Sequence, residues 1–252
     1  MRDVLTALAA GEITVEEAEG ALRGYATGES GRFDVARDFR RGIPEAILAT
    51  GKTPEEVAAL CETAVTTTGR AIITRITDAQ RQAIRDRFRD SNNTVEMEDH
   101  ERAGVLVVRD EESVPPTLDA TVGIVAAGTA DAGPAGEAAA IAAELGATVT
   151  RLDDVGVANL TRITDQLPVL RDLDVIVVAA GREGALPTVV AGLVPAPVIG
   201  LPVSSGYGHG GDGEAALLGM LQSCTVLSVV NIDAGFVAGA QAALIARAVD
   251  SG

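Results

Sequence analysis

Four side chains in the second half of this 252-residue chain could take part in covalent or acid–base chemistry. Cys224 carries one of only two thiols, and His209 carries one of two imidazoles. A thiolate is a nucleophile, and an imidazole transfers protons near neutral pH. Arg182 and Glu183 stand side by side between two glycines, where they could supply an anion contact and a carboxylate base. These residue types predict nucleophilic catalysis with proton transfer.

Both cysteines also have a structural interpretation. Cys224 continues a helical repeat of apolar side chains that includes Leu217 and Met220. Unpaired cysteine is among the most buried residue types, so this spacing favours a place in the core. Cys61 shares one face of a predicted helix with Val57 and has the same interpretation. Spacing alone favours core packing for both thiols, and the case for a nucleophile at Cys224 comes from the neighbouring loops.

The loop that contains His209 is unusually rich in glycine. Five of the eight residues from Gly206 to Gly213 are glycine. Glycine lets a backbone approach a ligand closely, and Ser204, Ser205 and Tyr207 add hydroxyl groups that can form hydrogen bonds. This composition favours a ligand-binding loop, although a mobile surface loop is the alternative interpretation.

A second loop, residues 127–134, leads into a predicted helix at residues 135–145. The free N–H groups at the start of that helix, together with the hydroxyl of Thr129, are suited to binding a phosphate. Gly128 and Asp131 are also common types in ordinary strand-to-helix turns. The loop is therefore consistent with a phosphate cradle and with a plain turn.

From residue 118 onward, short apolar runs alternate with helical segments of about ten residues. The predicted strands are 122–126, 148–152, 175–179, 198–201 and 226–232. Such runs are typical of strands buried on both faces, and the alternation predicts an α/β fold with a doubly wound parallel sheet. Ligands bind such sheets at the carboxyl ends of the strands. We therefore predict a nucleotide-binding catalytic domain over residues 118–252.

Residues 1–113 show a different pattern, which predicts a smaller N-terminal α+β domain. The predicted helices are Val15–Leu22, Pro54–Ala64 and a charged, surface-facing helix at Asp78–Arg89, and the predicted strands are 71–74 and 104–108. The acidic, proline-containing segment 110–117 is predicted to be a linker.

The composition limits the possible partners and location. A net charge of −16 argues against binding to nucleic acid or to an anionic membrane, because both are negatively charged. The excess of acidic residues and the single lysine, Lys52, favour adaptation to high salt or a GC-rich genome. Two cysteines, with no apolar leader and no membrane-spanning run, predict a cytoplasmic protein with reduced thiols.

Several common cofactor motifs are missing from the sequence. The two cysteines and two histidines lack the spacing of zinc ligands, so a structural metal is not expected. The chain contains neither a Walker-type phosphate loop nor the strand–GxGxxG–helix dinucleotide fingerprint. Hydride-transfer chemistry is therefore not expected.

Four segments most clearly carry a resemblance to a known family: Val122–Asp131, Ala180–Pro187, Pro197–Val203 and Asn231–Ala240. They resemble the LarB family of nickel-pincer cofactor biosynthesis, whose carboxyl-terminal half is similar to the PurE aminoimidazole ribonucleotide carboxylases and mutases. The resemblance implies a PurE-like, flavodoxin-like three-layer fold for residues 118–252. Residues 41–46, 51–54 and Thr74-Arg75 are similar to LarB rather than to PurE, so the resemblance extends upstream.

The resemblance implies roles for particular residues. Glu183, His209 and Cys224 match catalytic residues of the LarB family. Ala185 stands where PurE enzymes have a histidine that shuttles a substrate proton, so the resemblance implies that purine chemistry fails here. Arg75 matches a position that could bind a ring carboxylate. The substrate-binding residues implied by resemblance and loop position are Gly128, Thr129, Asp131, Arg182, Ser204, Ser205, Gly206 and Tyr207.

The reaction that the resemblance implies joins a carboxylation to a hydrolysis. The substrates would be nicotinic acid adenine dinucleotide and carbon dioxide or bicarbonate, and the products pyridinium-3,5-biscarboxylic acid mononucleotide and AMP. Magnesium would be held mainly by the substrate phosphates, with few protein ligands, and the assembly would be a homo-octamer. A PurE-like mutase and a non-catalytic nucleotide sensor are the alternatives.

Overall fold

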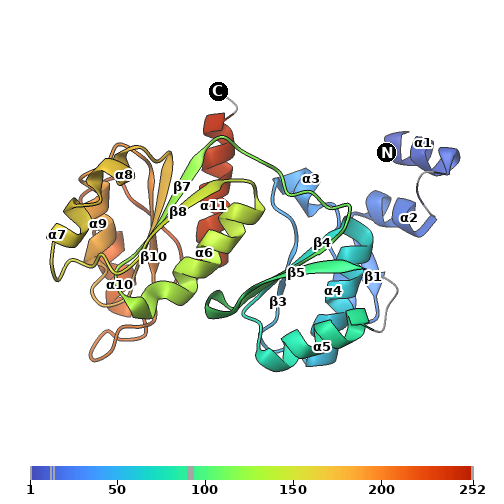
Figure 1. Ribbon diagram of the computed structural model, residues 1–252, viewed down its shortest axis with the longest axis horizontal. Helices are drawn as coiled ribbons and strands as arrows, with labels where there is room; N and C mark the ends of the chain where they lie inside the picture. Colours follow the sequence, from blue (N-terminus) through green and yellow to red (C-terminus); the bar gives the residue numbers. More distant parts are fainter. Residues whose placement is uncertain (1, 12, 14, 90–93, 251–252) are drawn as a thin grey trace. The chain divides into compact units, whose positions relative to one another are not determined.

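The computed structural model describes residues 2–11, 13, 15–89 and 94–250 (Figure 1). The chain forms two compact units, of which the first ends at Val114 and the second begins at Pro115. Each unit has its own sheet and its own apolar core. The outermost positions of the two predicted domains, Met1 and residues 251–252, lie outside the described residues.

The N-terminal unit is built on a four-stranded mixed sheet with the order β3-β4-β6-β5. β3 and β4 are parallel, and the other neighbours are antiparallel. The strands of this sheet are β3 (Ala46–Leu48), β4 (Arg70–Thr74), β5 (Val95–His100) and β6 (Val105–Asp110), and a separate hairpin consists of β1 (Ala26–Gly28) and β2 (Gly31–Phe33). The helices are α1 (Arg2–Ala10), α2 (Val15–Arg23), α3 (Arg37–Arg41), α4 (Pro54–Thr68), α5 (Asp78–Arg89) and the 3-10 turn η1 (Glu101–Ala103).

Helices α4 and α5 cover one face of this sheet. The Thr53 side chain and Glu56 form a capping box at the start of α4, and Gly69 ends the helix in the left-handed conformation. α5 was predicted to face solvent, but the structure buries one side of it, including Ile84 and Arg81. The reason is that every helix that covers a sheet must turn one stripe toward the core.

The C-terminal unit contains a five-stranded, all-parallel sheet with the order β11-β10-β9-β7-β8. In chain order this is the flavodoxin-like arrangement 2-1-3-4-5, which confirms the predicted doubly wound α/β fold. The strand order reverses between β7 and β9, and such a switch point opens a crevice beyond the carboxyl ends of the strands. The strands are β7 (Thr121–Ala126), β8 (Thr148–Leu152), β9 (Val175–Ala180), β10 (Val198–Pro202) and β11 (Ser228–Val229).

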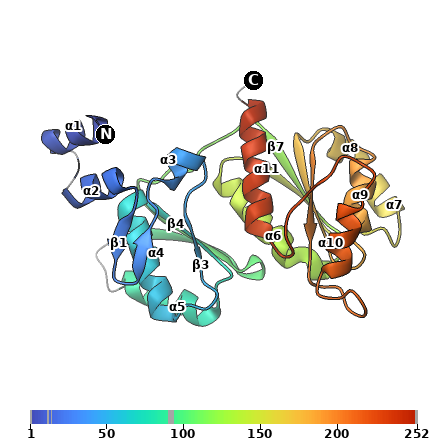
Figure 2. The ribbon, with the colours of Figure 1, turned by 180° about the vertical axis from the view of Figure 1, so that it is seen from behind.

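Helices cover both faces of this sheet and give three layers (Figures 1 and 2). α6 and α11 pack on one face with alanines such as Ala138 and Ala242, which allow close approach. The other face is covered by leucine, isoleucine and methionine side chains such as Leu186 and Met220. The helices are the 3-10 turn η2 (Thr129–Asp131), α6 (Ala132–Glu144), α7 (Thr161–Thr164), α8 (Leu167–Arg171), α9 (Ala185–Ala191), α10 (Glu214–Leu221) and α11 (Gly235–Asp250).

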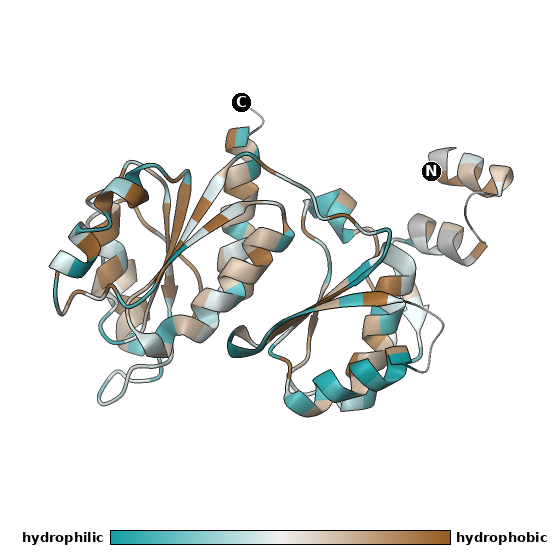
Figure 3. Ribbon diagram, viewed as in Figure 1, coloured by the Kyte–Doolittle hydropathy of each residue, from teal (hydrophilic) through white to brown (hydrophobic). Residues whose placement is uncertain are grey.

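The strand predictions need one correction. The central strands β7, β9 and β10 are buried almost throughout, and Figure 3 shows the apolar colour concentrated along them. β8 and β11 were also predicted to be buried on both faces, yet both are partly exposed, and β11 spans two residues instead of 226–232. Both lie at the edges of the sheet, where a strand has only one neighbour.

The helices that the structure describes are of moderate length. The two longest, α4 and α11, contain 15 and 16 residues. In the described ranges, none of the helices combines the length and the apolar character needed to cross a bilayer.

Candidate active site

Of the five loops that follow the carboxyl ends of the strands in the C-terminal unit, at what we term the carboxyl edge, four carry the groups described below. They are residues 127–131 after β7, 181–184 after β9, 203–213 after β10 and 231–234 after β11. The first two flank the switch point of the sheet. All of the site residues that the sequence placed in residues 118–252 lie in these loops, except Cys224.

Asp131 links two of the loops. Its Oδ2 accepts a hydrogen bond of 2.9 Å from the Gly128 N–H, and its Oδ1 accepts one of 2.6 Å from the Ser205 hydroxyl. Burial of Asp131, which is only 5% exposed, raises the pKa of its carboxyl group. The two hydrogen bonds lower this pKa and the charge of Asp233 raises it further. The sequence pattern could not distinguish a cradle from a plain turn, and the structure shows that this carboxylate holds a composite loop together.

Gly181 allows the loops to come together. A Cβ atom on Gly181 would stand 1.8 Å from Ser205 Oγ and 2.9 Å from Asp131 Oδ1. Gly206 is similarly close, because its Cβ would lie 3.0 Å from the Gly181 carbonyl oxygen. The absence of a side chain at Gly181 is therefore required for the bond between Ser205 and Asp131.

AMP is the nucleotide product that the resemblance implies, and on that expectation Gly181→Ala should weaken AMP binding at least about tenfold, because the added methyl group must displace the Ser205 hydroxyl and open the cradle. Gly192→Ala, at the far end of α9, is the matched control, since a Cβ there meets its nearest neighbour at an ordinary 3.5 Å. Isothermal titration calorimetry with AMP measures both effects. Equal affinities for the two variants would contradict this account of the cradle.

Asp233, in the loop after β11, holds the loop after β10 in place. It was not among the residues singled out from the sequence. Its Oδ1 accepts a hydrogen bond of 2.9 Å from the Ser204 N–H, and its own N–H donates to the Pro202 carbonyl at 2.9 Å. Asp233 also adopts a left-handed backbone conformation with φ 55°. An aspartate directly after the predicted strand 226–232 was the available signal, because aspartate tolerates this conformation.

Arg182 and Tyr207 form an exposed pair at the same edge. The Arg182 Cζ atom lies 4.1 Å from the centre of the Tyr207 ring, which is within cation–π range. Tyr207 is 79% exposed. An arginine stacked on an exposed aromatic ring offers a flat cationic surface to an anionic or aromatic ligand.

The structure overturns core packing for Cys224. α10 ends at Leu221, so the predicted helical repeat does not extend to Cys224, and the residue is exposed. The turn that carries it is fixed, because the Thr188 hydroxyl on α9 donates to Ser223 Oγ at 3.0 Å and the Thr225 N–H donates to the same atom at 3.3 Å. The thiol is accessible on a turn that is tethered to α9.

The core interpretation is confirmed for Cys61, which is fully buried in α4. Burial is the main cause that raises the pKa of this thiol, and the charge of Glu62 adds to it. A thiol with a raised pKa carries little thiolate near neutral pH, so Cys61 is a poor nucleophile. The two thiols therefore differ in environment.

Glu183 and His209 are both exposed. The Glu183 backbone packs against α10, since a Cβ on Gly219 would lie 2.5 Å from the Glu183 carbonyl oxygen. Cys224 follows Gly219 by five residues, on the turn after that helix. Within the described ranges, no hydrogen bond or ion pair joins the side chains of Glu183, His209 and Cys224.

The remaining predicted residues have different surroundings. Thr129 and Ser204 are exposed on their loops. Arg75 belongs to the N-terminal unit, where it directly follows β4, is exposed and adopts a left-handed φ of 55°. Among the residues that the structure describes, no group of three or more His, Cys, Asp or Glu side chains is arranged to hold a metal ion.

Comparison with known proteins finds a family model for each of the two units. The family model for AIR carboxylase matches residues 121–251, and the model for the LarB/PurE-like N-terminal domain matches residues 25–110. An uncharacterised protein of Methanocaldococcus jannaschii is 35% identical over 254 residues, which cover 98% of this chain and 97% of the relative. A crystal structure of a PurE2 variant of Treponema denticola covers 55% of this chain and 81% of its own, with 21% identity and a TM-score of 0.38.

The parallel sheet with its carboxyl-edge loops is therefore a PurE-like domain of the AIR carboxylase type. Because a LarB/PurE-like N-terminal domain precedes it, the chain belongs to the LarB family, a family of the carboxylase type.

Proposed function

We propose that this protein carboxylates the pyridinium ring of nicotinic acid adenine dinucleotide and hydrolyses its phosphoanhydride. The products are pyridinium-3,5-biscarboxylic acid mononucleotide, which serves nickel-pincer cofactor biosynthesis, and AMP. The observation that carries the proposal is the exposed Cys224 thiol, held on a fixed turn in a PurE-like domain that has no histidine at position 185.

The ring chemistry explains why a thiol is needed. A pyridinium ring is electron-poor, so its carbon-5 cannot attack carbon dioxide. When the Cys224 thiolate adds to carbon-4, a C–S bond forms and the ring electrons move to the nitrogen, which leaves an enamine whose carbon-5 is nucleophilic. Carbon-5 then forms a C–C bond with carbon dioxide.

The second half of the reaction restores the aromatic ring. A base removes the proton from carbon-5, the electron pair of that C–H bond re-forms the ring double bond, and the C–S bond breaks to release the thiolate. Glu183 is the base in our proposal, because it is an exposed carboxylate whose backbone packs on α10, the helix that leads to the Cys224 turn. His209 assists proton transfer or polarises the phosphoanhydride that water cleaves.

The carboxyl-edge loops suit the nucleotide part of the substrate. The proposed nucleotide contacts come from the linked loops that contain Gly128, Asp131 and Ser205, and the stacked pair of Arg182 and Tyr207 adds a cationic surface. The Asp131 carboxylate is already engaged by two donors, and the described residues form no carboxylate cage. The proposal therefore places magnesium on the substrate phosphates. None of the roles proposed for Cys224, Glu183 and His209 depends on magnesium.

The direct test is an assay of the purified protein with nicotinic acid adenine dinucleotide, bicarbonate and magnesium. The expected result is one AMP for each pyridinium product, with the product heavier than nicotinic acid mononucleotide by one carboxylate group. Formation of neither product would refute the proposal. The same preparation in size-exclusion chromatography with light scattering tests the proposed homo-octamer.

A further inference from the structure

Three hydroxyl groups are bonded to one another at the turn that carries Cys224. The Thr188 hydroxyl on α9 donates to Ser223 Oγ at 3.0 Å, and Ser223 Oγ lies 2.9 Å from Thr225 Oγ1. The Thr225 N–H also donates to Ser223 Oγ, at 3.3 Å. We term Thr188, Ser223 and Thr225 the hydroxyl chain. Two of its members are the immediate sequence neighbours of Cys224.

The direction of the hydroxyl chain follows from a count of donors and acceptors. A serine oxygen has two lone pairs and one hydrogen. The Thr188 hydroxyl and the Thr225 N–H occupy both lone pairs of Ser223 Oγ, so the Ser223 hydrogen is donated to Thr225 Oγ1. The Thr225 hydroxyl therefore accepts within the chain, and its own hydrogen is left to donate outside it. The chain ends in a hydrogen-bond donor one residue after the thiol.

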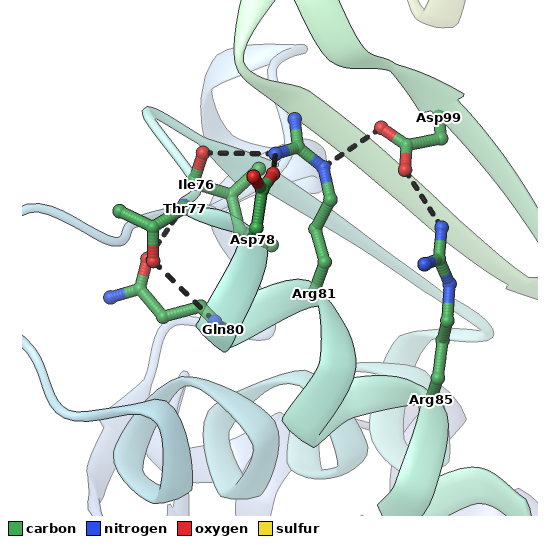
Figure 4. A network of polar contacts seen from close by, with 7 residues as sticks. All are labelled: Ile76, Thr77, Asp78, Gln80, Arg81, Arg85 and Asp99. Carbon is green, nitrogen blue, oxygen red and sulfur yellow. Dashed lines mark hydrogen bonds and ion pairs between the residues drawn. The ribbon is translucent and has the colours of Figure 1, made fainter.

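The segments that form this turn carry no charge. α9 and residues 215–232 contain no aspartate, glutamate, histidine, lysine or arginine. Elsewhere the structure joins elements through charged groups, as in Figure 4, where Arg81 and Arg85 on α5 donate to the two oxygens of Asp99 at 3.0 Å each. An anion formed at Cys224 would therefore meet dipoles, and no cation, from α9 and residues 215–232.

We propose that the hydroxyl chain stabilises the thiolate of Cys224, with the Thr225 hydroxyl as the donor to the sulfur and with Thr188 and Ser223 as positioning residues. The inference rests on the proposed function, in which this thiolate adds to carbon-4 of the ring. A hydrogen bond to an anion is stronger than one to a neutral group, and each hydroxyl that donates along a chain polarises the next one. When the thiol gives its proton to solvent, the Thr225 hydrogen turns to the sulfur, and no bond of the chain breaks.

Thr225→Val and Thr188→Val are the test variants. The first removes the donor itself. The second acts through the chain, because without the Thr188 hydroxyl a lone pair of Ser223 Oγ becomes free to accept the Thr225 hydrogen, which is then lost to the thiolate. Thr188→Ser keeps the hydroxyl and is the conservative variant.

Thr164→Val is the matched control. Thr164 lies on α7 in the same unit and is exposed. Its hydroxyl donates to backbone carbonyls three and four residues earlier, at 3.2 and 3.1 Å. The substitution therefore removes a threonine hydroxyl that has no part in the hydroxyl chain.

The measurement is the rate at which iodoacetamide alkylates Cys224 in the full chain, followed by mass spectrometry of the peptide that contains Cys224. At about pH 7 the thiolate fraction limits this rate. Loss of one hydrogen bond lowers that fraction about tenfold, but the less stabilised thiolate is more nucleophilic, so both valine variants should react about fourfold more slowly than the parent. At about pH 10.5 every accessible thiol is ionised, so the order should reverse, with the valine variants about twofold faster.

The reversal separates thiolate stabilisation from a change in folding or exposure. A turn that has moved or closed would react more slowly at both pH values, and that result would overturn the inference. Any pattern other than the reversal in both valine variants would also overturn it. Thr188→Ser and Thr164→Val should keep nearly the parental rates, and a Thr188→Ser variant that behaves like Thr188→Val would show that the hydroxyl is not the cause.

The alkylation test is independent of turnover. Absence of carboxylation in the parent protein would refute the proposed function, whereas the alkylation rates would still decide the role of the hydroxyl chain. If the protein does carboxylate the ring, both valine variants should lower kcat with little change in KM, because the thiolate acts in the chemical step.

Discussion

Cys224→Ala should lower the carboxylation rate by at least about a thousandfold, because without the thiol no group can make carbon-5 of the ring nucleophilic. The exposed position of Cys224 on a turn that is bonded to α9 predicts little change in folding. Product formation measured by chromatography and mass spectrometry, together with circular dichroism, checks both parts of this prediction.

The second thiol provides the control for this experiment. Cys61→Ala removes a sulfur atom from the core of the N-terminal unit, so we expect a loss of about 1 kcal/mol in the free energy of unfolding and nearly unchanged turnover. Denaturant titration measures the first quantity and the product assay measures the second. Equal activity in the Cys224→Ala variant and the parent would exclude the thiol as the nucleophile.

Glu183→Gln should lower turnover by about 10²–10⁴-fold, the usual effect of removing a general base. The substitution keeps the size of the side chain but removes the group that takes the carbon-5 proton. Because this step follows the formation of the C–S and C–C bonds, we expect the carboxylated adduct to accumulate. Intact mass spectrometry should show the protein heavier by the dinucleotide and one carbon dioxide, with the added mass on the peptide that contains Cys224.

Glu214→Gln is the matched control for the base. Glu214 is an exposed glutamate at the first position of α10, and the proposal gives it no chemical role. The Glu214→Gln variant should keep turnover within about twofold of the parent and should accumulate no adduct. If Glu183→Gln behaves in the same way as Glu214→Gln, another residue must act as the base.

The fold of the C-terminal unit could be predicted because its signals are local and periodic. Apolar runs such as 122–126 and 175–179 are long enough to identify buried strands, and their alternation with helices leaves few possible topologies. The edge strands were harder to predict. A segment such as 226–232 has the composition of a buried strand, but only its position in the sheet decides that just Ser228 and Val229 pair with β10.

In the candidate site, too, local features could be predicted from the sequence and contacts between distant residues could not. The residue types and the loops were readable from the sequence, because glycines, hydroxyls and charges gather directly after the strands. The bond between Ser205 and Asp131 was not, because it joins residues 74 positions apart and depends on the missing side chain at Gly181. Asp233 was overlooked for a similar reason, since its bond to the Ser204 N–H spans 29 positions.

The sequence by itself determined the parallel α/β class, the chemical types at the carboxyl edge and the core position of Cys61, because these follow from local periodicity and composition. Only the tertiary structure decided that the Cys224 side chain is exposed, because its helical spacing suggested a place in the core. α10 ends at Leu221 and Thr188 holds the following turn, so the thiol is exposed. Packing against other elements, rather than spacing along the chain, decides where a helix ends. It also decides which distant side chain bonds the turn that follows the helix.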